Sequence, residues 1–179
     1  MNRYNLFYLF KSDYLRYEEK FNFIDFLIKV TLGIGPLQSV FLYRLARWCL
    51  LKKIPIIHSI LTRINIVLNS CEISAYADIG PGLKIAHAQG IVIGRSVKIG
   101  HSATIFHNIT IGAKTPFDGN EEMPILNDNV TLYTGAKVLG AITVGSNVKI
   151  GADTLVIEDI PSNTTVVTNK KVKLIRSIE

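Results

Sequence analysis

Aliphatic residues recur at every sixth position along most of the chain after Cys71. A second aliphatic residue lies four positions later in many of these hexads, and a small residue often follows the first one. Period six fits neither the 3.6-residue period of a helix nor the two-residue alternation of a hairpin strand. The residues that lead the hexads are Ile73, Ile79, Ile85, Ile93, Ile99, Ile105, Ile111, Leu126, Leu132, Val138, Val144, Ile150 and Val156.

Hexads of this kind predict a parallel β-helix. Three hexads form one coil of a triangular prism, in which each hexad supplies a short strand and a corner. The leading side chain points inward and stacks on its equivalent one coil away, at the strand-pairing distance of about 4.8 Å. A β-sandwich would need two-residue alternation and hairpin turns instead. We therefore expect a mainly β fold, with the β-helix at 71–160 and a C-terminal tail at 161–179.

Residues 1–70 are expected to form a helical segment. Apolar residues in 21–28 follow an i, i+3, i+4 pattern. Gly and Pro at 33–36 break the chain, and further helices are predicted at about 38–52 and 55–69. The apolar stripes of these helices are expected to be core or subunit contacts rather than a cofactor site.

The positive charge lies wholly in this helical segment. The chain of 179 residues has a formal charge of +6, and residues 1–70 contain ten basic and four acidic residues, while 71–179 are balanced. A solvated helical surface explains this charge, and so does attraction to an anionic membrane face or to an acidic or lipid-phosphate-linked substrate. Nucleic acid is disfavoured because no recognised binding motif accompanies the charge.

The remaining bulk features point to the cytoplasm. Proline and polar residues interrupt the longest apolar stretches, so no membrane-spanning helix is predicted. The apolar run from Leu6 to Phe10 is too short for the core of a signal peptide, so none is predicted. Cys49 and Cys71 form no CxxC pattern and are expected to be reduced thiols. The predicted location is cytoplasmic, with the basic segment as a candidate for peripheral contact with the inner membrane face.

The repeat is interrupted once by an extended loop at 114–124, with the sequence KTPFDGNEEMP. A polar loop that leaves a rigid scaffold commonly carries function. The alternative is a surface insertion without a role.

Hexad spacing brings two histidines together. His87 and His107 are each third in their hexads and one coil apart, so they should stack on one face. On the next face, the third positions Ala113, Thr134 and Ala152 are expected to form a ladder of small side chains. Such a ladder leaves a shallow groove for a thin, extended ligand. A histidine beside it is suited to acyl transfer, because imidazole can take a proton from a hydroxyl and backbone N–H groups can stabilise an oxyanion.

Residues 36 to 168 resemble the serine acetyltransferase family and its short relatives in surface-polysaccharide gene clusters. The segment EISAYADIGPGLKIAHAQGIVIG is similar to the family's segment around its catalytic histidine, and FHNITIGAK is similar to its VTLGG segment. Upstream, LQSVFLYRLARWCL resembles the helix before the β-helix, with the Arg-x-Ala-x-Trp pattern beginning at Arg44.

The resemblance implies a left-handed β-helix that works as a homotrimer and uses acetyl-CoA as co-substrate. It assigns His87 as the general base. It places cofactor-binding residues along a channel between adjacent subunits and at the tail that approaches the cofactor phosphates. These residues are Ala113, Thr134, Lys149, Ala152, Lys170 and Lys171.

Departures from the family pattern concern the acceptor. The family has an Asp before its catalytic histidine, and this chain has Ala86. The family's loop carries Arg-His-Pro, and this chain has Glu122, Met123 and Pro124. Replacing the Arg that would pair with an amino acid's carboxylate by Glu should repel that carboxylate. Glu122, Met123 and His107 are the candidate acceptor-site residues. A backbone carbonyl, Asp118 or Glu121 are candidates to replace the missing Asp.

The sequence thus favours an acetyl-CoA-dependent O-acetyltransferase acting on a neutral hydroxyl, such as a sugar of a surface polysaccharide. Serine O-acetyltransferase of cysteine biosynthesis is the alternative. A zinc lyase on the same fold would need three converging histidines, and His101 and His107 are expected on different faces, so no metal is predicted. A non-catalytic scaffold is the fourth hypothesis.

Overall fold

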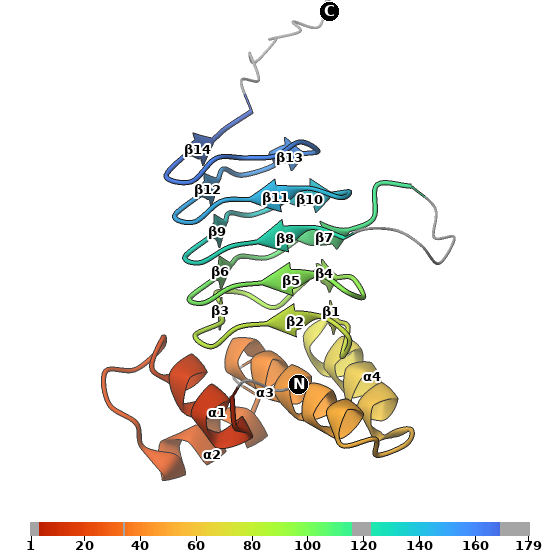
Figure 1. Ribbon diagram of the computed structural model, residues 1–179. Coiled ribbons are helices and arrows are strands. Elements are labelled where there is room, and N and C mark those ends of the chain that lie inside the picture. The colour runs from red at the N-terminus through yellow and green to blue at the C-terminus, as the bar shows by residue number, and fades with distance from the viewer. Residues whose placement is uncertain (1–3, 34, 116–122, 169–179) are drawn as a thin grey trace, which may run out of the picture.

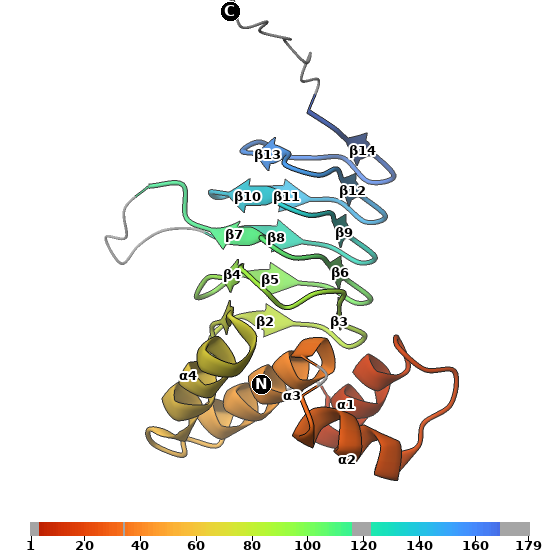
Figure 2. The same cartoon turned by 180° about the vertical axis from the view of Figure 1, so that it is seen from behind.

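The described residues form four helices followed by a three-sided prism of short parallel strands, with the helices at one end (Figure 1). The computed structural model describes residues 4–33, 35–115 and 123–168. The helices are α1 (Leu6–Tyr14), α2 (Phe23–Thr31), α3 (Gly35–Leu51) and α4 (Ile57–Asn69). The opposite view shows the same stacking of coils above the helical base (Figure 2).

Successive strands lie on successive faces of the prism, and every strand pairs in parallel with its equivalents one coil away. Face A contains β1 (Cys71–Ile73), β4 (Ile91–Ile93), β7 (Thr110–Gly112), β10 (Lys137–Leu139) and β13 (Leu155–Val156). Face B contains β2 (Asp78–Ile79), β5 (Lys98–Ile99), β8 (Ile125–Leu126) and β11 (Thr143–Val144). Face C contains β3 (Lys84–Ile85), β6 (Thr104–Ile105), β9 (Thr131–Leu132), β12 (Lys149–Ile150) and β14 (Thr165–Val166).

The leading aliphatic residues of the hexads fill the interior, as predicted. Ile73 pairs with Ile93, and Ile85 with Ile105, one coil apart. All thirteen predicted leading residues are buried and belong to one core cluster. The prediction of a left-handed parallel β-helix is therefore confirmed.

The β-helix extends beyond the predicted boundary at 160. Strand β14 pairs with β12, with Ile150 opposite Val166, so 161–166 belongs to the last coil rather than to a tail. The hexad spacing hides this strand because Val166 comes ten positions after Val156 instead of six, and Pro161 lies between them. Residues 169–179 lie outside the described part of the chain.

The helical prediction was correct in kind but wrong in one boundary. Helix α2 buries Phe26 and Val30, whereas Ile24, Leu27 and Ile28 of the predicted apolar stripe are exposed. Helix α3 already begins at Gly35, so that Gly35 and Pro36 form its first turn instead of a break before it. Among the described residues no single helix is long and apolar enough to span a membrane; α2 and α3 pass that test only together, across a 95° bend.

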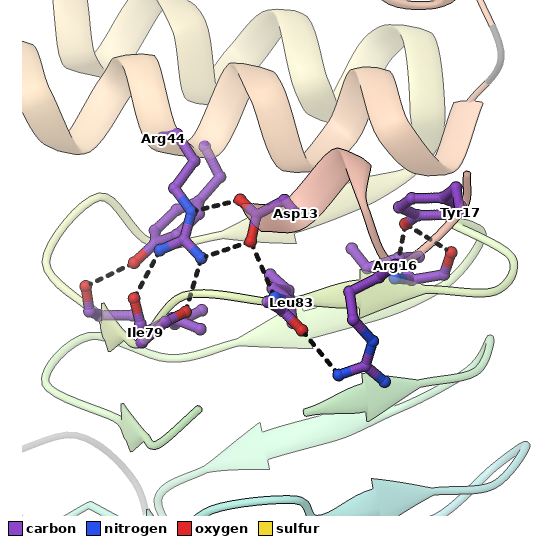
Figure 3. Close-up of polar contacts among 11 residues, drawn as sticks. Asp13, Arg16, Tyr17, Arg44, Ile79 and Leu83 are labelled. Atoms are coloured by element: carbon purple, nitrogen blue, oxygen red, sulfur yellow. Dashed lines mark hydrogen bonds and ion pairs between the residues drawn. The ribbon is translucent and has the colours of Figure 1, made fainter. Parts of the chain in front are cut away.

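A buried ion pair joins the helices to the first coil (Figure 3). Arg44 on α3 donates to both carboxylate oxygens of Asp13 on α1, over 2.8 and 3.1 Å, and both residues are at most 2% exposed. The same guanidinium donates to the carbonyl oxygens of Ile79 and Gly80, and Asp13 accepts from the Leu83 amide at 2.8 Å. These contacts satisfy backbone groups at the lower end of the prism that no further coil would reach.

Two residues after α1 cover the lower edge of face C (Figure 3). The Tyr17 hydroxyl donates to the Ile85 carbonyl at 2.9 Å and accepts from the Ile85 amide at 2.8 Å. Arg16 donates to the Gly82 carbonyl and, at 2.9 Å, to the Thr104 hydroxyl. Burial raises the pKa of the Tyr17 hydroxyl, which therefore keeps its proton. The strand that leads to His87 is thus fixed from below.

We expect Asp13→Asn to lower the free energy of unfolding by about 3–5 kcal/mol, because it leaves the buried Arg44 charge without a counter-charge. The asparagine retains an oxygen for the Leu83 amide, so the loss reports mainly on the ion pair. Urea denaturation followed by circular dichroism measures it.

The matched control is Asp78→Asn, which removes the partner of Arg47. That ion pair, at 2.6 Å, has a 69% exposed carboxylate side chain, and its loss should cost at most about 1 kcal/mol. Equal, small losses for the two variants would contradict a central role of the Asp13–Arg44 pair.

Tyr17→Phe should lower the free energy of unfolding by about 1–3 kcal/mol, since it leaves the amide and the carbonyl of Ile85 without this partner. Hydrogen exchange should accelerate at the Ile85 amide but not at the Thr131 amide, which donates to the Val148 carbonyl higher in the stack. Tyr8→Phe, at a 47% exposed tyrosine, is the control and should change neither quantity.

Candidate active site

The two histidines predicted to stack do so on face C. His87 follows β3 and His107 follows β6, and the register of these strands places Ile85 opposite Ile105. The ring centroids are 5.6 Å apart with an angle of 77° between the planes, so that the edge of one ring meets the face of the other. Strand pairing alone therefore brings together two imidazoles that are twenty positions apart in sequence.

Thr134 and Ala152 lie in one column with the two histidines, instead of forming a ladder on the next face. Register pairs Ile105 with Leu132, and Leu132 with Ile150. Thr134 and Ala152, each two residues after these leading positions, therefore lie above His87 and His107 along the same corner. Lys149 lies on β12 of the same face and is exposed.

Ala113 does not belong to this column, so the predicted three-member ladder was wrong. It follows β7 on face A, whereas Thr134 follows β9 on face C. The insertion leads the chain from β7 on face A to β8 on face B, and β9 comes one face later. Ala113 is thus two strands before Thr134 rather than a whole coil before it.

The surroundings of the two imidazoles differ. His87 is exposed, and His107 is partly buried. The Nδ1 atom of His107 is buried and has no hydrogen-bond partner among the described residues, which leaves Nε2 as the nitrogen that can meet a ligand. Within the described ranges no acidic residue forms an ion pair with His87; the only such contact of a histidine is between His101 and Asp128, at 3.5 Å.

Sequence reasoning overlooked an aromatic pair beside the column. Phe106 and Tyr133 precede His107 and Thr134, and their ring centroids are 5.2 Å apart. Tyr133 is 38% exposed and borders the same corner. The sequence contained the signal, because Phe106 and Tyr133 are second in their hexads. In the neighbouring coils the same position holds the small residues Ala86 and Gly151.

Only part of the predicted acceptor and cofactor sets is described. Glu122, Asp118 and Glu121 of the loop and Lys170 and Lys171 of the tail lie outside the described residues. Met123 is described, and it packs against the core of the β-helix, close to Gly94. Its side chain is therefore a packing contact within this chain.

His101 is the remaining histidine of the prism, and its surroundings are different. His101 follows β5 on face B, so it and His107 lie on different faces, as predicted. The His101 Nε2 atom is 2.9 Å from the Tyr4 hydroxyl. In the part of the chain that the structure describes, no group of three or more His, Cys, Asp or Glu residues is placed to hold a metal ion. Burial raises the pKa of the Cys71 thiol to about 11, which keeps it protonated and unreactive.

Comparison with known proteins identifies relatives over most of the chain, although no protein-family model matches it. A serine acetyltransferase of Helicobacter pylori is 39% identical over 142 residues, which cover 79% of this chain and 82% of that protein. A serine acetyltransferase of Synechococcus elongatus is 36% identical over 140 residues. This chain spans only 57% of the length of the Synechococcus protein.

Solved structures agree with the sequence relatives. The serine acetyltransferase of Neisseria gonorrhoeae superimposes with a TM-score of 0.81 at 26% identity, over 97% of this chain and 66% of that one. Isoform 3 from Entamoeba histolytica, solved in complex with cysteine, also gives a TM-score of 0.81, at 25% identity over 97% of this chain and 62% of that one. With its hexad-built prism and its histidine column, the chain belongs to the serine acetyltransferase family.

Proposed function

We propose that this protein transfers an acetyl group from acetyl-CoA to a hydroxyl group, with His87 as the general base and L-serine as the acceptor to test first. The observation that carries the proposal is the column on face C, where the exposed imidazole of His87 is followed by His107 and then by the small side chains of Thr134 and Ala152. Relatives named serine acetyltransferase support both the reaction and the acceptor.

The chemistry needs few groups. An imidazole nitrogen of His87 takes the proton of the acceptor hydroxyl while the oxygen attacks the thioester carbonyl. Backbone N–H groups stabilise the negative charge that develops on the carbonyl oxygen. The carbon–sulfur bond then breaks, and the proton held by His87 goes to the departing CoA thiolate. In this proposal His107 orients the acceptor hydroxyl through its Nε2 atom.

The column also suits the thin arm of acetyl-CoA. Thr134 and Ala152 continue from the histidines with small side chains, and the exposed Lys149 offers a positive charge to phosphate. Ala113 lies at a different corner of the same prism. His87 and Ala113 would therefore line one channel only if neighbouring subunits supplied them, which supports the proposed homotrimer.

A sugar hydroxyl is the second candidate acceptor. The sequence favoured it on three departures from the family pattern, at Ala86, Glu122 and Met123, and two of them still support it: Ala86 replaces an Asp, and Glu122 replaces an Arg of the family's loop. Met123 packs against the core and does not replace a polar acceptor contact. The relatives support L-serine more strongly than they support a sugar.

His87→Ala should lower the rate of CoA release from acetyl-CoA with L-serine by roughly 10²- to 10⁴-fold, the usual contribution of a general base. Thiol detection with and without acceptor measures this rate. His101→Ala is the matched control, because His101 holds the same hexad position on face B, and its rate should stay at the wild-type value.

CoA release that depends on a sugar but not on L-serine would identify the sugar hydroxyl as the acceptor. Unchanged activity in the His87→Ala variant would contradict the assigned base. Failure of the wild-type protein to bind acetyl-CoA, measured by calorimetry, would contradict the acetyl-transfer proposal as a whole.

Lys149→Ala should raise the KM for acetyl-CoA by roughly fivefold with little change in kcat, since one exposed charge contact contributes up to about 1 kcal/mol. Lys98→Ala removes the equivalent exposed lysine of face B and should leave the KM unchanged. Equal effects of the two variants would show that the net charge, rather than the site on face C, sets the KM.

A further inference from the structure

Arg95 is an exposed cation at the corner where face A meets face B. It is third in the hexad led by Ile93, and the register of β4 and β7 places Ile93 opposite Ile111. Arg95 therefore lies one coil below Ala113, which is third in the hexad led by Ile111. Helix α4 and strands β1, β4 and β7 lie one above another at this side of the molecule (Figures 1 and 2).

An aromatic contact holds the guanidinium of Arg95 and leaves its donors free. The Arg95 Cζ atom lies over the ring of Tyr76, 3.9 Å from the ring centroid, and the Tyr76 ring in turn meets His58 of α4 edge to face. An arginine that stacks in this way uses the face of its planar group, whereas its N–H groups point outward in the plane. Within the described residues no hydrogen bond or ion pair uses these N–H groups. Arg95 is thus an oriented cation that can receive an anion.

The insertion rejoins the prism beside Arg95. The preceding residue, Gly94, lies next to Met123, so that a Cβ atom at Gly94 would be 3.8 Å from the Met123 Sδ atom. Met123 and Glu122 take the places of His and Arg in the family's loop triplet, whose Arg would pair with the carboxylate of an amino acid. The chain has lost that arginine, and it carries Arg95 where the triplet meets the prism.

The level of Arg95 matches the level of the proposed base. His87 precedes β4 and Arg95 follows it, so the width of face A separates the two within one subunit, and they are less than half a coil apart along the chain. In the proposed homotrimer, the corner that carries Ala113 meets the His87 corner of a neighbouring subunit. If the prisms are parallel, Arg95 lies about 4.8 Å below Ala113, close to the level of that neighbour's imidazole.

We infer that Arg95 of one subunit binds the carboxylate of the acceptor L-serine, whose hydroxyl reacts at His87 of the neighbouring subunit. The inference rests on the proposed function and names the residue that selects an amino acid as acceptor. A guanidinium edge can donate two parallel hydrogen bonds to one carboxylate, and a sugar hydroxyl offers no such charge. Arg95 thereby compensates for Glu122 in the loop.

The test compares L-serine with L-serinamide, which keeps the hydroxyl and amino groups and replaces the carboxylate by a neutral amide. CoA release by the full chain gives kcat and KM for each acceptor. Arg95→Ala should raise the KM for L-serine roughly 10- to 100-fold, as expected for a lost charge-assisted contact, and leave the KM for L-serinamide within about twofold. Neither kcat nor the KM for acetyl-CoA should change much.

Two further variants are matched to this one. Arg95→Lys should give an intermediate KM for L-serine, because an ammonium group keeps the charge but not the paired donors. Lys98→Ala removes an exposed cation three positions further along, on face B, and should leave both acceptors unchanged. The turnover of L-serinamide by each variant shows that it is folded.

A wild type that acetylates L-serine with a KM that Arg95→Ala leaves unchanged overturns the inference and leaves the proposed function standing. Equal increases in KM for the two acceptors, or an increase for acetyl-CoA alone, also overturn it, because the lost contact would not be with the carboxylate. A wild type that acetylates neither acceptor contradicts the proposed acceptor together with the inference.

Mixed particles test whether the two residues come from different subunits. The Arg95→Ala and His87→Ala chains are co-expressed with different tags, and particles that contain both are purified. A channel between His87 of an Arg95→Ala subunit and Arg95 of a His87→Ala subunit carries both native side chains. Turnover at low L-serine concentration should therefore exceed that of either variant alone. Mixed particles without this gain overturn the inference.

Discussion

The stacking of one aliphatic side chain on its equivalent in the next coil is the constraint on which the whole molecule depends. Each strand of the prism has only two or three residues, far too few to be stable in isolation. Its stability comes from an inward side chain packed above and below, and from backbone hydrogen bonds to both neighbouring coils. His87, His107, Thr134 and Ala152 are positioned by this repetition.

A stack of this kind has two ends, and the lower one carries the first strands of all three faces. The helices close this lower end with side chains of opposite charge, which also form hydrogen bonds with backbone groups of the first coil. Arg44 was visible in the sequence only as part of a family pattern. In the structure it is a buried cation paired with Asp13 and bonded to carbonyl oxygens of the first coil. Tyr17 closes the neighbouring edge through both backbone groups of Ile85.

Counting hexads predicted the structure correctly where the six-residue repeat is continuous, and it failed where the repeat is interrupted. The stacked His87 and His107 followed from counting hexads, and that prediction is confirmed. Ala113 was assigned to the wrong face because the count was carried across an insertion of unknown path. Strand β14 was missed because Pro161 breaks the spacing before it.

The helices were harder to predict, since their contacts join residues far apart in the chain. No local pattern shows that Asp13 pairs with Arg44, or that α4 buries asparagines and exposes isoleucines. The exposed stripe of α2 was expected to be a core or subunit contact, and its inner side is supplied by Phe26 and Val30 instead. The residues of the loop and the tail that concern the acceptor and the cofactor phosphates remain predictions from the sequence.

The insertion at 114–124 connects two strands whose positions do not depend on it. The strands on either side of it, β7 and β8, are each held by neighbours in the coils above and below. The chain must therefore leave one face and rejoin the next at fixed points, whatever its length between them. Substitutions, insertions or deletions in that segment need not alter the register of a single coil. Selection can thus alter the sequence of this segment while the histidine column stays in place.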